Sequence, residues 1–132
     1  MGNGSMVVAL PGSEETVRGW TASLVVVDEA ARAPEELYTA LRPMLATTDG
    51  ALWLLSTPAG KQGFFWREWA QGKEDWERVE ARASECARIP ATFLESEREA
   101  LGERKYAQEY ECSFEEVEGA VIRAEWIERM ER

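Results

Sequence analysis

Apolar runs separated by polar turn residues divide the first half of the chain into short strands and one helix. Residues 6–10, 24–27 and 51–55 are apolar runs, bounded by Gly, Pro, Asp or Ser, and such runs are typical of strands. Residues 34–45 instead repeat apolar side chains at helical spacing, after a Pro-Glu-Glu start that favours a helix N-terminus. This order predicts an α/β fold. Because residues 24–28 are apolar on both faces, we expect a central strand of a parallel sheet, covered by helices on both sides.

Helical spacing also predicts four helices in the second half, over residues 64–70, 92–101, 105–111 and 124–130. Thr92 and Glu95 fit a capping box at the start of the second of these helices, and Gly102 is expected to end it. Residues 79–84 alternate small apolar and polar side chains, which predicts an edge strand with one face in water. The acidic, turn-prone residues 114–119 are the predicted linker.

Composition places the chain among globular proteins. Its 132 residues fit one domain, and a hydrophobic content of 45% with six Trp and four Phe can build a core. No apolar run approaches the ~20 residues that cross a bilayer, and the N-terminus lacks a signal-peptide pattern. We therefore expect a soluble, non-secreted protein with no membrane partner. Cys86 and Cys112 lack zinc-site spacing, and we expect both to be reduced and buried.

Charge and the absence of histidine narrow the chemistry. Without His, Ser-His and Cys-His nucleophile schemes within this chain are excluded, and acid-base work falls to carboxylates. A net charge of −10 argues against a broad cationic groove for nucleic acid, so Lys61, Arg67 and Lys73 could contact DNA phosphates only locally. Six aromatic residues could stack bases, but their spacing favours core packing. They are Trp20, Trp53, Phe64, Phe65, Trp66 and Trp69.

The strand over residues 24–28 ends in two adjacent carboxylates, Asp28 and Glu29, which is a Walker B pattern. In nucleotide-driven motors the first carboxylate orients a magnesium ion, and the second polarises the water that attacks a phosphoryl group. Ser56 and Thr57 follow the next strand and place hydroxyls where a γ-phosphate could be sensed. Each motif also has an ordinary structural explanation, as an acidic strand end or a capped turn.

An ordered set of motifs resembles the large terminase subunit of tailed bacteriophages. The set consists of Leu10-Pro11-Gly12, Thr16-Val17-Arg18-Gly19, Val25-Val26-Val27-Asp28-Glu29-Ala30-Ala31, Arg42-Pro43-Met44-Leu45, Leu55-Ser56-Thr57-Pro58, Gly63-Phe64-Phe65 and Gln108-Glu109-Tyr110. The resemblance implies an ATPase that pumps viral DNA into a procapsid, joined to a nuclease. It implies an incomplete RecA-like sheet of the additional-strand (ASCE) P-loop NTPase type, three-layered and mostly parallel, without the Walker A strand, loop and helix.

The same resemblance implies roles for five residues. Asp28 would orient Mg²⁺ through water, and Glu29 would be the general base for the water that attacks ATP. Ser56 and Thr57 match the motif that couples hydrolysis to movement. Arg18 matches a position proposed to act as an arginine finger on a neighbouring subunit, although a surface ion pair with a nearby glutamate explains it equally well.

The phosphate-binding loop of the family, GxxxxGK followed by Ser or Thr, does not occur in these residues. Gly60-Lys61 is rejected as such a loop, because Leu55 stands where the first glycine is required and Gln62 where the hydroxyl should be. Without that loop the phosphates lose their main anchor, so we expect no appreciable ATP hydrolysis by this chain alone. The acidic cluster of the nuclease is also missing.

We therefore expect residues 1–113 to be part of a terminase ATPase domain, and residues 114–132 to be a linker leading towards the nuclease. The implied partners are double-stranded DNA, the portal and the small terminase subunit, in the cytoplasm of a host cell that carries a phage or prophage. A sheet without its phosphate-loop strand is expected to self-associate, to pair with a missing half or to rearrange. The alternatives are a non-catalytic relic or docking module, and a DExx-type helicase fragment, which the Ser-Thr-Pro motif disfavours.

Overall fold

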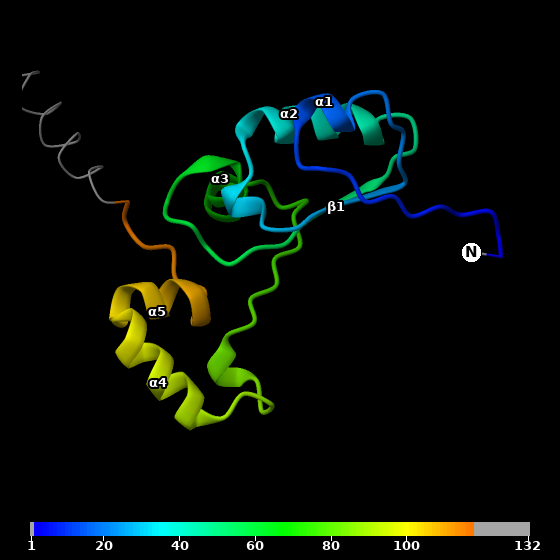
Figure 1. Cartoon of the computed structure of the whole chain (residues 1–132). Coiled ribbons are helices and arrows are strands. Elements are labelled where there is room, and N and C mark those ends of the chain that lie inside the picture. Colours follow the sequence, from blue (N-terminus) through cyan, green and yellow to red (C-terminus); the bar gives the residue numbers. More distant parts are fainter. Residues whose placement is uncertain (1, 118–132) are drawn as a thin grey trace, which may run out of the picture. The chain divides into compact units, whose positions relative to one another are not determined.

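The computed structural model describes residues 2–117, which form two compact units that divide between Leu55 and Ser56 (Figure 1). In chain order the elements are α1 (Glu14–Val17), β1 (Leu24–Val27), η1 (Ala30–Arg32), α2 (Glu35–Leu45), β2 (Ala51–Leu54), α3 (Gly63–Gln71), η2 (Ala83–Glu85), α4 (Ala91–Leu101) and α5 (Glu103–Tyr110), where η denotes a short 3₁₀ helix. The helix predicted over residues 124–130 and the end of the predicted linker lie outside the described residues. No helix in the described part of the chain has the length and apolar character needed to cross a membrane.

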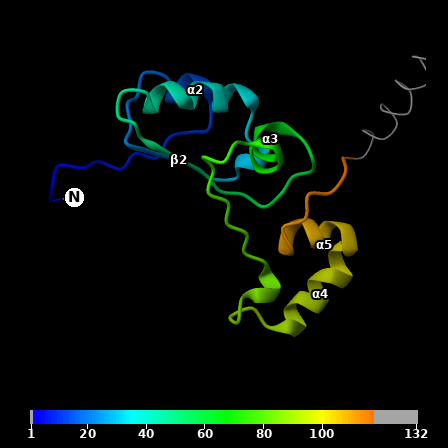
Figure 2. The ribbon, with the colours of Figure 1, turned by 180° about the vertical axis from the view of Figure 1, so that it is seen from behind.

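The first unit is a strand–helix–strand arrangement in which β1 and β2 pair in parallel. Strand β2 is labelled in Figure 2. The register of the pair runs from Leu24 opposite Ala51 to Val27 opposite Leu54. Helix α2 connects the two strands and buries its apolar side, with α1 packed beside it (Figure 1). A helix between parallel strands is the expected crossover, so the predicted order of strand, helix and strand is confirmed here.

One face of this sheet is uncovered. Val27 is buried and Val25 half-buried on the face that carries α2, whereas Leu24, Val26 and Trp53 on the other face are 47%, 48% and 56% exposed. Within residues 2–117 the sheet has two strands, so β1 is not the central, doubly covered strand that its apolar sequence predicts. The apolar residues are present, but within the described residues of the first unit no element covers them.

Two predicted strands are absent from the described residues. The segment at residues 6–10 has no regular secondary structure and does not join the sheet, and Met6 and Val7 are 74% and 80% exposed. In the segment 79–84, Arg82 forms an ion pair with Glu80. The backbone N–H of Arg82 donates to the carboxylate of Glu85, the last residue of η2, and so caps the start of this short helix. Both predictions are wrong because a β-prone pattern makes a strand only when another strand supplies its backbone partners.

The second unit contains α3, α4 and α5. The predicted helices over residues 64–70, 92–101 and 105–111 are confirmed within one or two residues, and Gly102, with φ of 78°, separates the last two. The capping box predicted from Thr92 is wrong. The helix begins one residue earlier, at Ala91, so Pro90 occupies the N-cap and Thr92 lies inside the first turn.

An aromatic cluster joins α3 to the residues that follow α5. The ring of Phe114 lies 4.8 Å from Trp66, 6.0 Å from Phe65 and 6.1 Å from Trp69 between centroids. Core packing is therefore confirmed for Phe64 and Phe65, which are buried, whereas Trp66 and Trp69 are half-buried against Phe114. It is wrong for Trp20 and Trp53, which are 40% and 56% exposed.

The two cysteines are free thiols, and neither is fully buried. Cys86 is exposed and Cys112 is half-buried. The expectation that both are buried is therefore wrong, since both lie in surface segments outside the helices and strands.

Candidate functional site

The two carboxylates of the Walker B pattern leave the sheet at the end of β1. The backbone N–H of Leu55 donates to the Val27 carbonyl oxygen at 2.9 Å, and the N–H of Ala30 donates to the Leu55 carbonyl oxygen at 3.0 Å. Both strands therefore end at the same edge, with Asp28 and Glu29 following one strand. Ser56 is the next residue of the chain after Leu55. In open parallel sheets, ligands bind at the carboxyl ends of the strands.

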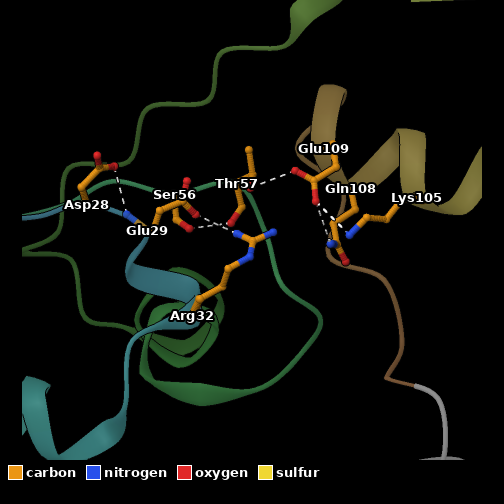
Figure 3. Close-up of polar contacts among 8 residues, drawn as sticks. All are labelled: Asp28, Glu29, Arg32, Ser56, Thr57, Lys105, Gln108 and Glu109. Atoms are coloured by element: carbon orange, nitrogen blue, oxygen red, sulfur yellow. Dashed lines mark hydrogen bonds and ion pairs between the residues drawn. The ribbon is translucent and has the colours of Figure 1, made fainter. Parts of the chain in front are cut away.

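Glu29 turns the chain sharply from β1 into η1. Its backbone lies in the left-handed region, with φ of 54° and ψ of 37°, which is uncommon for a residue other than glycine. The turn lets the Glu29 N–H donate to Oδ1 of Asp28 at 2.9 Å (Figure 3). Such a conformation costs on the order of 1 kcal/mol, and strained backbone of this kind clusters at functional sites.

The Glu29 side chain has a partner that the sequence reasoning missed. Its Oε2 lies 2.9 Å from Nη1 of Arg32, one helical turn further along the chain (Figure 3). Both side chains are largely exposed, so the pair adds little to stability and chiefly restrains the direction of the carboxylate. The spacing of three residues across a short helical turn is the signal that could have revealed this pair.

Arg18 pairs with Glu14 on α1. The Nε of Arg18 donates to Oε1 of Glu14 at 2.8 Å, and both side chains remain partly exposed. Of the two explanations left open for this arginine, the described residues contain the local ion pair. An action on the nucleotide of a neighbouring subunit stays a prediction.

Ser56 and Thr57 belong to the second unit. The hydroxyl of Ser56 donates to the Thr57 carbonyl oxygen at 2.6 Å, and Oγ1 of Thr57 donates to Oε2 of Glu109 on α5 at 3.4 Å (Figure 3). Oε1 of Glu109 lies 3.0 Å from Nζ of Lys105. The sequence motifs include Glu109, but its contact with Thr57 spans 52 residues, which local patterns do not reveal.

The carboxylates suit a magnesium ion that is held mostly by other ligands. Among the described residues no three His, Cys, Asp or Glu side chains form a cluster that could hold a metal ion. Mg²⁺ in nucleotide sites keeps several waters and binds one or two carboxylates together with phosphate oxygens. Asp28 is an exposed carboxylate that fits this mode, but its affinity depends on phosphates being anchored nearby.

Comparison with known families gives one match over nearly the whole chain. The family model described as "Terminase large subunit, T4likevirus-type, N-terminal" matches residues 2–129. This range includes every motif that the sequence analysis singled out. No curated protein and no solved structure is significantly similar to the chain.

Proposed function

We propose that this chain, which belongs to the T4-like-virus type of the terminase large-subunit family, carries the catalytic carboxylates of the ATPase that drives DNA packaging. The family is a DNA-packaging family, and its N-terminal region is the ATPase region. The observation that carries the proposal is the pair Asp28 and Glu29 at the end of a parallel strand whose neighbour leads directly into Ser56 and Thr57.

The proposed roles follow from the chemistry of each side chain. Bound ATP and Mg²⁺ would supply the phosphoryl group and neutralise its charge. Asp28 would hold a water of the ion, and Glu29 would take a proton from the attacking water. Thr57 and Ser56 would respond to the γ-phosphate. The left-handed backbone at Glu29 supports this assignment, because it turns the Glu29 side chain away from the direction of the Asp28 side chain, as two separate roles require.

Arg18 would act on a nucleotide held by a neighbouring subunit. To do so its guanidinium must leave Glu14, with which it forms an exposed ion pair. Exposed pairs are worth about 0.2–1 kcal/mol, so the exchange for a phosphate costs little. The local pair is therefore compatible with the proposed role.

We also propose that the strands of this chain are part of an incomplete RecA-like sheet. The uncovered face at Leu24, Val26 and Trp53 supports it, because parallel sheets are normally covered on both faces. The 132 residues contain no GxxxxGK followed by Ser or Thr, so the phosphate loop must come from other residues, on this polypeptide or another. Residues 1–113 would be the ATPase part and residues 114–132 would lead towards the nuclease.

The family membership also suggests the partners of the assembly. Double-stranded DNA, the portal of the procapsid and the small terminase subunit would bind the complete motor in the host cytoplasm. With a net charge of −10, this chain would contribute few of the DNA phosphate contacts itself.

The test is Mg²⁺-dependent ATP hydrolysis, measured for the chain alone and together with the segment that carries the phosphate loop. The coding DNA upstream is the first place to identify that segment. We expect turnover only in the combination. Glu29→Gln should lower it by at least about 100-fold, because a general base contributes 10²–10⁴-fold. Glu35→Gln, an exposed acidic residue at the start of α2, is the matched control and should leave the rate within about twofold.

Three outcomes would contradict parts of this proposal. Turnover that is insensitive to Glu29→Gln would remove its catalytic role. Glu29-dependent turnover by the chain alone would show that the phosphates are anchored within these residues. If neither preparation binds or hydrolyses ATP, the result would favour a non-catalytic docking module.

A further inference from the structure

The turn that follows the Ser56-Thr57-Pro58 motif is held by residues 113–117, which we call the strap. The backbone N–H of Lys61 donates to the Glu115 carbonyl oxygen at 3.2 Å, and Nζ of Lys61 lies 2.5 Å from Oε1 of Glu116. Gly60 has φ of 79° and is buried, and a Cβ there would lie 2.7 Å from Cγ2 of Val117. Backbone, charge and close packing therefore fasten this turn to the strap.

The strap is itself anchored to two helices. Its Phe114 packs against aromatic rings of α3, nearest to Trp66. From α5, Arg104 donates to the Glu116 carbonyl oxygen, and its Nε lies 3.8 Å from Oε2 of Glu115. Residues 113–117 therefore make specific contacts with α3, α5 and the turn, and the chain continues from them beyond residue 117.

The motif is also held at its other end. Thr57 lies four residues before Lys61 in the chain, and its Oγ1 donates to the carboxylate of Glu109 on α5. Between these two attachments lie Pro58, whose φ is restricted by its ring and which is buried, Ala59 and Gly60. Because only three residues separate the two attachments, a displacement of Thr57 is expected to reach Lys61 and its strap contacts.

We propose that Lys61 is a positioning residue that transmits displacement of the Ser56-Thr57-Pro58 motif through the strap to the chain beyond residue 117. The proposal rests on the proposed function, because the displacement is the one that ATP hydrolysis would cause. It assigns the Lys61 ammonium to Glu116 and not to a DNA phosphate, the contact that the sequence alone allowed.

The contact is tested on the chain itself with a charge exchange. Lys61→Glu places like charges together and should lower the hydrogen-exchange protection of the residue 61 amide by about fivefold. Adding Glu116→Lys should restore that protection. Lys73→Glu makes the same change of charge on the exposed segment after α3 and should leave the residue 61 amide unaffected. If Lys61→Glu leaves the protection of this amide unchanged, the proposed contact between Lys61 and the strap is wrong.

A second experiment tests the function of the contact in the complete assembly, including the phosphate loop. It measures the rate of ATP hydrolysis and the amount of DNA packaged. Lys61→Glu should keep hydrolysis within about twofold and lower packaging on the order of tenfold, and the exchange with Glu116→Lys should restore packaging. A loss that the exchange does not restore would identify Lys61 as a DNA contact and overturn the proposal. If the unsubstituted assembly hydrolyses no ATP, the proposed function fails, and the amide protection still decides the strap.

Discussion

At the scale of single residues, the sequence located the carboxylates but not their surroundings. Asp28 and Glu29 follow an aliphatic run that predicts a strand, and they lie directly after β1. The left-handed backbone of Glu29 and its ion pair with Arg32 were not predicted, because glutamate has no preference for that conformation. Glu109 belongs to one of the family motifs, but only the tertiary structure shows that it accepts a hydrogen bond from Thr57.

Two glycines on either side of Lys61 separate backbone strain from steric overlap. Gly60 and Gly63 both have positive φ, 79° and 72°, but only at Gly60 would a Cβ meet a neighbour within 4 Å. We expect Gly63→Ala to lower the free energy of unfolding by about 1 kcal/mol. Gly60→Ala should cost about 1–2 kcal/mol more, because Val117 must move. Urea unfolding measures both, and equal costs would contradict the packing of Val117 on the turn.

Cys112 should be less reactive than a free thiol at neutral pH. Burial, reinforced by the negative charge of Glu80, raises the pKa of the Cys112 thiol, because the thiolate is disfavoured in that environment. The nucleophile is the thiolate, so alkylation should follow a titration displaced to higher pH. We would measure iodoacetamide rates against pH in a Cys86→Ser variant, folded and in urea. A folded midpoint at or below the midpoint in urea would contradict this environment.

At the scale of elements, periodicity predicted α2, α3, α4 and α5 together with β1 and β2. Helices satisfy their backbone within the element, and so local spacing suffices to predict them. Strands at residues 6–10 and 79–84 were wrong, because a strand depends on a partner that local sequence does not specify. The same reason explains why β1 has fewer neighbours than its composition suggests.

The C-terminus of α3 depends on Arg78, which lies outside every helix. Its Nη2 donates to the carbonyl oxygens of Glu68 and Gly72 at 2.8 and 2.9 Å, and its Nε donates to that of Trp69 at 2.9 Å. We expect Arg78→Met to lower the free energy of unfolding of the second unit by about 1–2 kcal/mol.

Arg78→Lys is the control for charge at the same position. Lysine keeps the favourable interaction with the helix dipole but cannot reach several carbonyls with a planar fork, so it should recover less than half of the loss. Thermal or urea unfolding followed by tryptophan fluorescence measures both variants. Full recovery by lysine would show that charge, and not the hydrogen-bond geometry, stabilises this end of α3.

At the scale of the whole molecule, the ordered motifs identified the family, and the match over residues 2–129 confirms it. The structure adds that residues 2–117 form two compact units, with the division directly before Ser56. The apolar run 51–55 does give way to the turn-prone residues 56–60 at this point, but the sequence contains many such turns and does not show which of them separates two units. The boundary between the units follows from the tertiary contacts that the residues of each unit make with one another.

The uncovered sheet face should make the isolated chain self-associate. Leu24, Val26 and Trp53 expose apolar surface beside strand edges that no other strand within residues 2–117 pairs with, and such surfaces are interaction or aggregation sites. In gel filtration with light scattering, we expect oligomers that Val26→Thr with Trp53→Thr reduces, with a parallel fall in apolar-dye fluorescence. Val79→Thr changes a more exposed apolar residue outside the sheet and should have no effect. A clean monomer before substitution would contradict this prediction.

The sequence by itself determined the family, the positions of Asp28, Glu29, Ser56 and Thr57, and most helices, because these depend on residue order and local periodicity. Only the tertiary structure decided which apolar runs become strands, which face of the sheet stays open, and that Lys61 binds the strap. These features require backbone or side-chain partners many residues away, and the energy of such contacts exists only once the chain has brought them together.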